Sequence, residues 1–135
     1  MTITFSTTRD LTAAQILPIY EANGWSAAQK PEQLHQGLIH SHSLVTAWAS
    51  DRLVGIGNAI SDGHLVVYYP HLLVHPDFQG QGIGRQILNR LQRHYQGFHM
   101  QILVSEHQAV GFYQALGFRQ AKDTQPMWIY AGNDL

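Results

Sequence analysis

The stretch Leu72–Arg85 constrains the fold of this 135-residue chain more than any other part of it. Its sequence predicts a buried strand, a proline stop, a glycine-rich turn and the first turn of a helix. Gly80, Gly82 and Gly84 allow positive φ angles and leave room for a ligand to approach the backbone. A helix N-terminus presents unpaired N–H groups and the positive end of the helix dipole. The turn therefore predicts an anion site, most naturally for phosphate.

Two common phosphate motifs do not fit this stretch. A Walker loop ends in Gly-Lys-Ser/Thr, and no lysine occurs between positions 30 and 122. The dinucleotide fingerprint Gly-x-Gly-x-x-Gly fails because Arg85 stands three positions after Gly82. What remains is a Gln-x-x-Gly-x-Gly pattern over residues 79–84, after a strand that ends in Val-His-Pro. An ordinary glycine-rich turn between a strand and a helix is the alternative interpretation.

Length and composition bound the remaining possibilities. A chain of 135 residues is expected to form a single domain, 1–135. Its net charge of −1 argues against general affinity for nucleic acid or anionic membranes, and it has no cysteine for a thiolate metal site. The nine histidines are scattered, so no metal site is predicted. Without a signal peptide or a long apolar run, the expected location is cytoplasmic.

Local patterns predict the following elements in the first half of the chain. Ile3–Phe5 alternates like a short strand. A capping box at residues 12–15 opens a helix that ends at Asn23-Gly24, and Pro31 begins a second helix. Strands are predicted at 44–49, 53–60 and 64–74. Pro70 predicts a bulge or a change of pairing within the last of these, because proline has no backbone N–H.

The second half predicts a helix that carries the glycine-rich turn, with apolar residues from Ile83 to Tyr95 on one face. The apolar run 100–104 predicts a strand covered on both faces. A short helix over 109–116 is expected to place Ala109, Phe112 and Leu116 inward and to end at Gly117. A last strand is predicted at 127–131.

These motifs resemble those of the GNAT (Gcn5-related N-acetyltransferase) superfamily. The Gln-x-x-Gly-x-Gly turn resembles the loop that binds the acetyl-CoA pyrophosphate, and Ala109-x-x-Phe-Tyr-x-x-x-Gly-Phe118 resembles the family's second motif. The order of predicted elements matches that family along nearly the whole chain. The resemblance implies an α/β (α+β) fold. Its central sheet would be mixed but mostly antiparallel, splayed between the fourth and fifth strands, with helices on both faces.

The resemblance also implies roles for particular residues. Acetyl-CoA would be the co-substrate, without a metal, and Tyr113 would be the general acid in direct transfer of the acetyl group to a primary amine. The backbone along the strand and the turn would bind the cofactor through Leu72, Leu73, Val74, Gln79, Gly80, Gln81, Gly82, Ile83, Gly84 and Arg85. The family often has asparagine seven residues before the tyrosine, where this chain has Glu106.

The acceptor is predicted less directly. Residues around 46–62 resemble a branch that includes plant plastid arylalkylamine (serotonin) and lysine acetyltransferases. This resemblance implies a small-molecule amine as partner, and the family allows a homodimer. Five residues are candidates for the acceptor side or the general base: Tyr20, Trp25, Asp62, His71 and Glu106. Packing explains Tyr20 and Trp25 equally well. A protein lysine or N-terminal acetyltransferase and a non-catalytic acyl-CoA sensor are the alternative functions.

Overall fold

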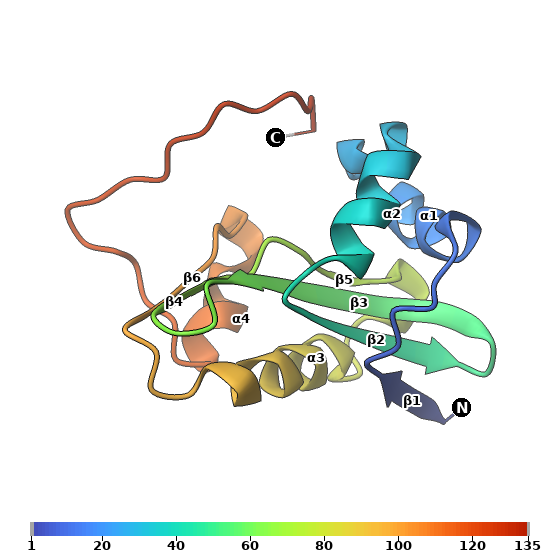
Figure 1. Ribbon diagram of the computed structural model, residues 1–135, viewed down its shortest axis with the longest axis horizontal. Helices are drawn as coiled ribbons and strands as arrows, with labels where there is room; N and C mark the ends of the chain where they lie inside the picture. The colour runs from blue at the N-terminus through green and yellow to red at the C-terminus, as the bar shows by residue number, and fades with distance from the viewer. Residues whose placement is uncertain (1, 135) are drawn as a thin grey trace.

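The computed structural model describes residues 2–134 and contains a mixed sheet with helices on both faces (Figure 1). The strands are β1 (Ile3–Ser6), β2 (Ser43–Ala49), β3 (Arg52–Ser61), β4 (Val66–Tyr68), β5 (Leu72–Val74) and β6 (Met100–Ile102). The α-helices are α1 (Ala13–Ala22), α2 (Pro31–Ile39), α3 (Ile83–Gln92) and α4 (Val110–Ala115). The 3₁₀ turns are η1 (Ser26–Gln29), η2 (Pro76–Phe78), η3 (Arg93–Tyr95) and η4 (His107–Ala109).

The sheet divides at the strand that precedes the glycine-rich turn. Its order is β1-β2-β3-β4-β6, all antiparallel except β4–β6, and β5 pairs with a different part of β3. The single strand predicted over 64–74 is therefore two strands, interrupted around Pro70 as its missing N–H suggested. Among the described residues, β6 pairs with β4 and not with β5. β5 and β6 therefore diverge after the break. The predicted splay is confirmed.

A buried amide stabilises this break. The backbone N–H of Asn58 donates to the carbonyl of His71 at 3.2 Å, and the N–H of His71 donates to Asn58 Oδ1 at 3.1 Å. The Asn58 amide also donates to Ser41 Oγ at 2.9 Å, so its polar atoms are paired inside the sheet. The asparagine thereby fixes where β5 begins.

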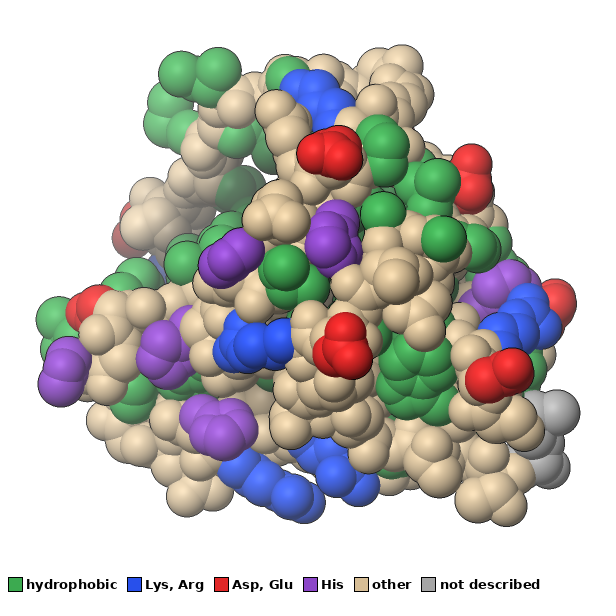
Figure 2. Space-filling view, turned by 45° about the vertical axis from the view of Figure 1, so that its right-hand side comes forward, with side chains coloured by type: hydrophobic (Ala, Val, Ile, Leu, Met, Phe, Trp, Pro, Cys, Tyr) green, Lys and Arg blue, Asp and Glu red, His purple; other side chains and the backbone are tan. Residues whose placement is uncertain are grey.

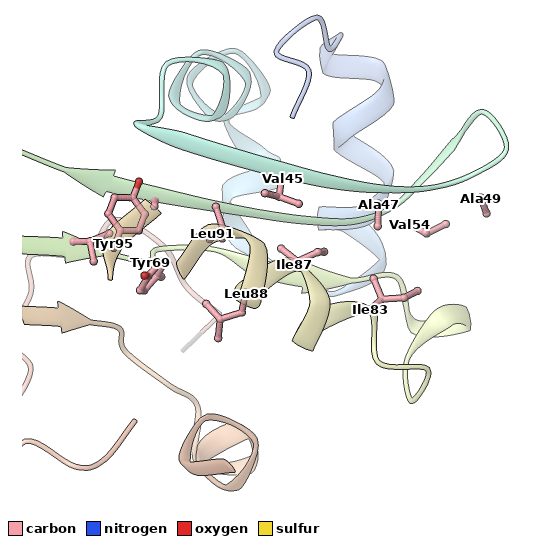
Figure 3. Close-up of a cluster of buried hydrophobic side chains, with 12 residues drawn as sticks. Val45, Ala47, Ala49, Val54, Tyr69, Ile83, Ile87, Leu88, Leu91 and Tyr95 are labelled. Carbon is pink, nitrogen blue, oxygen red and sulfur yellow. The ribbon is translucent and has the colours of Figure 1, made fainter. Parts of the chain in front are cut away.

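Helices cover the sheet from two sides. α1 and α2 lie on one face, where Ile16, Ile19 and Leu38 belong to one buried cluster, and α3 lies on the other (Figure 1). Figure 3 shows Ile83, Ile87 and Leu91 of α3 on the side of the helix that packs against β2 and β3. Gly55 and Gly57 permit this close approach, since a Cβ at either position would lie within 3 Å of Ile87.

The helix boundaries follow the predicted signals. The Thr12 side chain caps α1 and Gln15 completes the capping box, while Pro18 stays within the helix. Pro31 is at the start of α2, and Gly24 has a φ of 69° just after α1. These local predictions are confirmed.

Three predictions for the C-terminal part are wrong. Residues 127–131 form no strand, and the side chains of Met127 and Ile129 are fully exposed. The apolar run 100–104 is covered on one face only, because Met100, Ile102 and Val104 are 41–53% exposed. Phe112 is 38% exposed and is directed at the start of α3, so Tyr113 takes its inward place. The first two differences follow from a chain end that leaves the sheet (Figure 1).

Charge is dispersed over the surface in view in Figure 2, where acidic, basic and histidine side chains alternate without a large area of one sign. Within residues 2–134, no cluster of three or more metal-ligating side chains occurs. In the same range, no helix is long and apolar enough to cross a membrane.

Candidate active site

The glycine-rich turn has the predicted conformation at two of its three glycines. Gly80 and Gly82 have φ angles of 80° and 82°, and Gly82 is the N-cap of α3. Gly84 lies inside the helix, so the positive φ predicted for it is wrong. Its Cα instead faces Val74 and Phe112, with 3.6 Å available to a Cβ from each. Gly84 therefore contributes close packing and not an unusual backbone angle.

Several N–H groups converge at this turn. The N–H groups of the first helical turn, from Ile83 to Arg85, have no intrahelical acceptor. Gly82 has no side chain that could cap them. Among the described residues, the N–H groups of Gly80 and Gln81 also have no acceptor within hydrogen-bond distance. No acidic residue occupies the first turn of α3. The turn can therefore hold an anion through main-chain donors.

One side of β5 is committed to the sheet. The carbonyl of His71 accepts from Asn58, and the N–H of His75 donates to the carbonyl of Val54 at 2.8 Å. Hydrogen-bonded pairs alternate along antiparallel strands, so Leu73, midway between these two, also directs its backbone at β3. Its side chain is buried against α1 and α2. The structure therefore directs Leu73 away from the side of β5 that was predicted to bind the cofactor, unlike its two neighbours.

The other side of β5 is open, because β6 has diverged. The backbone groups of Leu72 and Val74 face this gap by the same alternation. Two side-chain amides already bind the carbonyl of Val74: Asn23 Nδ2 at 3.2 Å and Gln79 Nε2 at 3.0 Å. Gln79 thus ties the glycine-rich turn to β5, and Asn23 ties both to the end of α1.

A cavity of about 620 Å³ opens where β5 and β6 separate. Its walls come from the η1 segment, the turn between β4 and β5, the residues after β6 and the end of the chain. The wall residues that matter for chemistry are Trp25, Tyr68, His71, Glu106, Trp128 and Tyr130. Three of the five predicted acceptor-side residues, Trp25, His71 and Glu106, therefore meet in one cavity.

Tyr20 supports this cavity from behind. Its hydroxyl lies 2.7 Å from Nδ1 of His71, and Trp25 packs edge-on against the rings of both residues, 5.9 Å and 5.2 Å away. Burial lowers the pKa of His71 to about 4 and raises the pKa of Tyr20 well above its usual value. His71 is therefore neutral and Tyr20 protonated at physiological pH.

The tautomer of His71 follows from the burial of Tyr20. A buried phenol must place its O–H on an acceptor, and Nδ1 of His71 is the partner within reach. In a neutral imidazole whose Nδ1 accepts, Nε2 carries the hydrogen. His71 lines the cavity, so its Nε2–H is the hydrogen-bond donor that this side chain can offer to a bound molecule.

Tyr113 is half-buried on α4, between the rings of Phe112 and Phe118. Burial, and secondly the negative charge of Glu106, raises the pKa of its hydroxyl. Tyr113 does not itself line the cavity, but Glu106 does. The negative charge of Glu106 therefore acts both on the hydroxyl of Tyr113 and on the cavity.

Asp62 lies outside this group. Its Oδ1 accepts from the backbone N–H groups of His64, Leu65 and Val66 at 2.8–3.2 Å, and these bonds lower its pKa. The carboxylate thus stabilises the turn before β4 and is not part of the cavity wall. A residue that follows a strand and precedes glycine commonly has this turn-forming role.

The chain end supplies site residues that sequence reasoning missed. Trp128 and Tyr130 stack with ring centroids 4.4 Å apart and line the cavity. The hydroxyl of Tyr130 donates a hydrogen bond to Asp134, and the carboxylate of Asp134 also accepts from the N–H of Ser26. The bond from Tyr130 is the main reason why the pKa of Asp134 is lowered to about 2. The alternation of residues 127–130 indicated a strand, but no pattern indicated which surface the strand would face.

Comparisons with known proteins agree with this geometry. The model of the acetyltransferase (GNAT) domain matches residues 8–127. A GNAT-family acetyltransferase from Streptococcus pneumoniae has a similar structure, with a TM-score of 0.82 and 29% identity, over 96% of this chain and 99% of that one.

Two relatives are similar in sequence. An uncharacterized N-acetyltransferase, ycf52, from Porphyra purpurea is 26% identical over 87% of this chain and 71% of its own length. A chloroplastic serotonin N-acetyltransferase 2 from Oryza sativa subsp. japonica is 31% identical over 70% of this chain and 50% of its own. With the family's domain model covering most of its length, this chain belongs to the GNAT acetyltransferases, which take their acetyl group from acetyl-CoA.

Proposed function

We propose that residues 1–135 form one N-acetyltransferase domain that moves the acetyl group of acetyl-CoA directly to the primary amine of a small, partly aromatic molecule. One observation carries this proposal. The cavity at the divergence of β5 and β6 combines the aromatic rings of Trp25, Trp128 and Tyr130 with the carboxylate of Glu106. Aromatic walls bind flat apolar groups, and the carboxylate attracts an ammonium group.

The cofactor side is proposed from the open main-chain groups. The turn from Gln79 to Arg85 would hold the pyrophosphate, and the backbone of Leu72 together with the N–H of Val74 would bind the pantetheine arm. The side chain of Ile83 is buried in the core, so only its backbone is offered. Acetyl-CoA brings an acetyl thioester to this gap; the protein supplies donors, orientation and exclusion of water.

The amine must lose a proton before it can attack. An alkylamine with a pKa of about 10.4 is neutral at pH 7 only roughly once in a few thousand molecules. Glu106 holds the ammonium group at the mouth of the cavity. The nitrogen loses one proton to water before it attacks and a second proton to water as the amide forms, and the coenzyme leaves as a thiolate. His71 lines the cavity and, as a neutral imidazole, donates a hydrogen bond from Nε2 to the oxygen that gains charge as the amine attacks.

Tyr113 acts on the leaving group. Its raised pKa keeps it protonated, so it donates a hydrogen bond to sulfur as the thiolate forms. A thiol with a pKa near 8.5 is a stronger acid than this tyrosine, so complete proton transfer is uphill. Hydrogen-bond donation to the developing charge is therefore the larger part of its role.

An acceptor panel tests the proposed substrate class. We expect arylalkylamines to exceed polyamines, amino acids and a lysine-containing peptide in kcat/KM, measured by coenzyme A release. A preference for the peptide would make the protein a lysine or N-terminal acetyltransferase. Acetyl-CoA binding without coenzyme A release on any amine would make it a sensor.

Replacing Gly82 tests the cofactor site. We predict that Gly82→Val weakens acetyl-CoA binding by well over tenfold, because a β-branched residue resists a φ of 82° and its side chain occupies the approach to the N–H groups. The measurement is isothermal titration calorimetry on folded protein.

Gly97→Val is the matched control. Gly97 has a φ of 81° and, like Gly82, no atom within 4 Å of where a Cβ would stand, but it follows η3 and lies outside the turn. Both variants therefore carry similar backbone strain, and only Gly82→Val should lose affinity. Equal affinities in the two folded variants would remove the turn from the cofactor site.

A further inference from the structure

The segment 119–134 is joined to the rest of the protein through one residue. It contains no helix or strand, and residues 121–131 are all exposed. Among residues 2–134, its hydrogen bonds to other parts of the chain all go to Ser26 at the start of η1. Figure 1 shows the segment running from the end of α4 across to the side of α1 and α2. The position of the segment therefore depends on Ser26.

Ser26, Tyr130 and Asp134 form a closed set of three hydrogen bonds, which we name the latch. The hydroxyl of Tyr130 donates to Asp134 Oδ1 at 2.7 Å, and the N–H of Ser26 donates to Asp134 Oδ2 at 3.1 Å. Ser26 Oγ lies 3.1 Å from the hydroxyl oxygen of Tyr130. Because Tyr130 gives its hydrogen to the carboxylate, Ser26 is the donor of this third bond. Two of the three bonds therefore end on an ionised group, which makes them stronger than bonds between neutral groups.

Gly132 shows that the latch is closely packed. A Cβ at this position would overlap Ser26 Oγ and the ring of Tyr130, so one of the two would have to move. The φ angle of Gly132 is not positive, so the backbone itself would accept another residue. Glycine is therefore required here by the contact between the segment and η1.

The latch connects two aromatic walls of the cavity. Trp128 and Tyr130 form one wall, with their rings stacked 4.4 Å apart and inclined by 10°. Trp25, which directly precedes Ser26 in the chain, belongs to the other wall. The three bonds of the latch therefore set the separation of the two walls.

We propose that Ser26, Gly132 and Asp134 are positioning residues through which the enzyme selects amines that carry an aromatic ring; this inference rests on the proposed function. With the latch closed, a flat ring of the acceptor contacts both aromatic walls. Breaking the latch frees the stacked pair, whereas the glycine-rich turn and the residues assigned to acetyl transfer keep their contacts. The loss should therefore fall on binding of the aromatic acceptor.

Kinetics with two amines test the selection. Asp134→Ala should raise KM for phenethylamine by about tenfold, the order expected when an aromatic contact is lost, and leave kcat and acetyl-CoA affinity close to those of the wild type. KM for butylamine, which has no ring, should not change. Asp134→Asn keeps a hydrogen-bonding group at this place and should restore most of the selectivity. Asp123→Ala, an exposed acid of the same segment, is the matched control.

Gly132→Ala tests the packing of the latch without removing any polar group. It should shift KM for phenethylamine in the same direction as Asp134→Ala, because the added Cβ separates Ser26 from Tyr130. Gly37→Ala is the control, since a Cβ at Gly37 meets no atom within 4 Å. A KM that rose equally for both amines in the latch variants, or for neither, would overturn the inference.

A distance measurement tests the latch without any substrate. The chain has no cysteine, so spin labels can be attached at Gln33→Cys on α2 and Gln125→Cys in the segment, both exposed. Pulsed electron spin resonance should give a narrow distance distribution for this labelled protein and a broad one once Asp134→Ala is added. Equal widths would overturn the latch. This result does not depend on acetyl transfer, so it is distinguishable from a failure of the proposed function, which the acceptor panel reports.

Discussion

Tyr113→Phe is expected to lower kcat on amine substrates by about 10²–10³-fold, the usual effect of removing one hydrogen-bond donor to a developing negative charge. The ring would remain between Phe112 and Phe118, so packing is retained and only the hydroxyl is lost. Acetyl-CoA affinity and melting temperature should stay close to those of the wild type. Steady-state kinetics and calorimetry measure the two effects separately.

The pH profile and the leaving group distinguish this role from packing. Because burial and Glu106 raise the pKa of Tyr113, any loss of wild-type kcat from its ionisation should occur at higher pH than the ionisation of a free tyrosine, whose pKa is about 10. An acyl donor whose leaving thiol has a low pKa needs less help, and it should reduce the difference between Tyr113→Phe and the wild type. If the variant turned over within twofold of the wild type with every donor, Tyr113 would be a packing residue.

Elements defined by local chemistry could be predicted from the sequence. The capping box at Thr12 and the glycines at positions 80 and 82 each act through their own backbone or a neighbour within a few residues. The same holds for the break near Pro70, where a missing N–H interrupts pairing whatever the surroundings. Such signals do not depend on which distant segment packs nearby.

Features that depend on distant partners could not be predicted this way. Residues 127–131 have a strand-like sequence, yet strand formation requires an edge to pair with, and the contacts of Ser26 hold the segment elsewhere. Likewise, the apolar run of β6 was predicted to be covered on both faces, but its composition cannot say whether a second layer is present.

The candidate site shows the same division. Asp62 and His71 were both candidates for the acceptor side by sequence, Asp62 at a turn and His71 on the predicted strand 64–74. The structure separates them by partners: three local N–H groups occupy Asp62, whereas His71 meets Tyr20 and Trp25 from 51 and 46 positions away along the chain. Only the fold brings the latter group together around a cavity.

His71→Phe is expected to lower kcat by about 10²–10³-fold, the usual effect of removing one donor to a developing oxyanion. A phenyl ring keeps the contact with Trp25 but has no N–H. It also leaves the buried hydroxyl of Tyr20 unpaired, which costs about 1–3 kcal/mol of stability. The double variant Tyr20→Phe/His71→Phe removes both polar partners and serves as the stability control. Turnover that recovered fully in the double variant would assign His71 to packing alone.

A second readout uses the pKa of His71. Because its folded pKa, about 4, is below its unfolded value of about 6.5, the unfolded chain binds more protons between these limits. Stability is therefore fullest above pH 6.5 and falls as pH decreases toward 4; from pH 7 to pH 5 the loss is about 2 kcal/mol. Urea unfolding at the two pH values should show this loss in the wild type and much less of it in the double variant. An equal loss in both proteins would mean that His71 is not held neutral, and the N–H donor assigned to it would then be wrong.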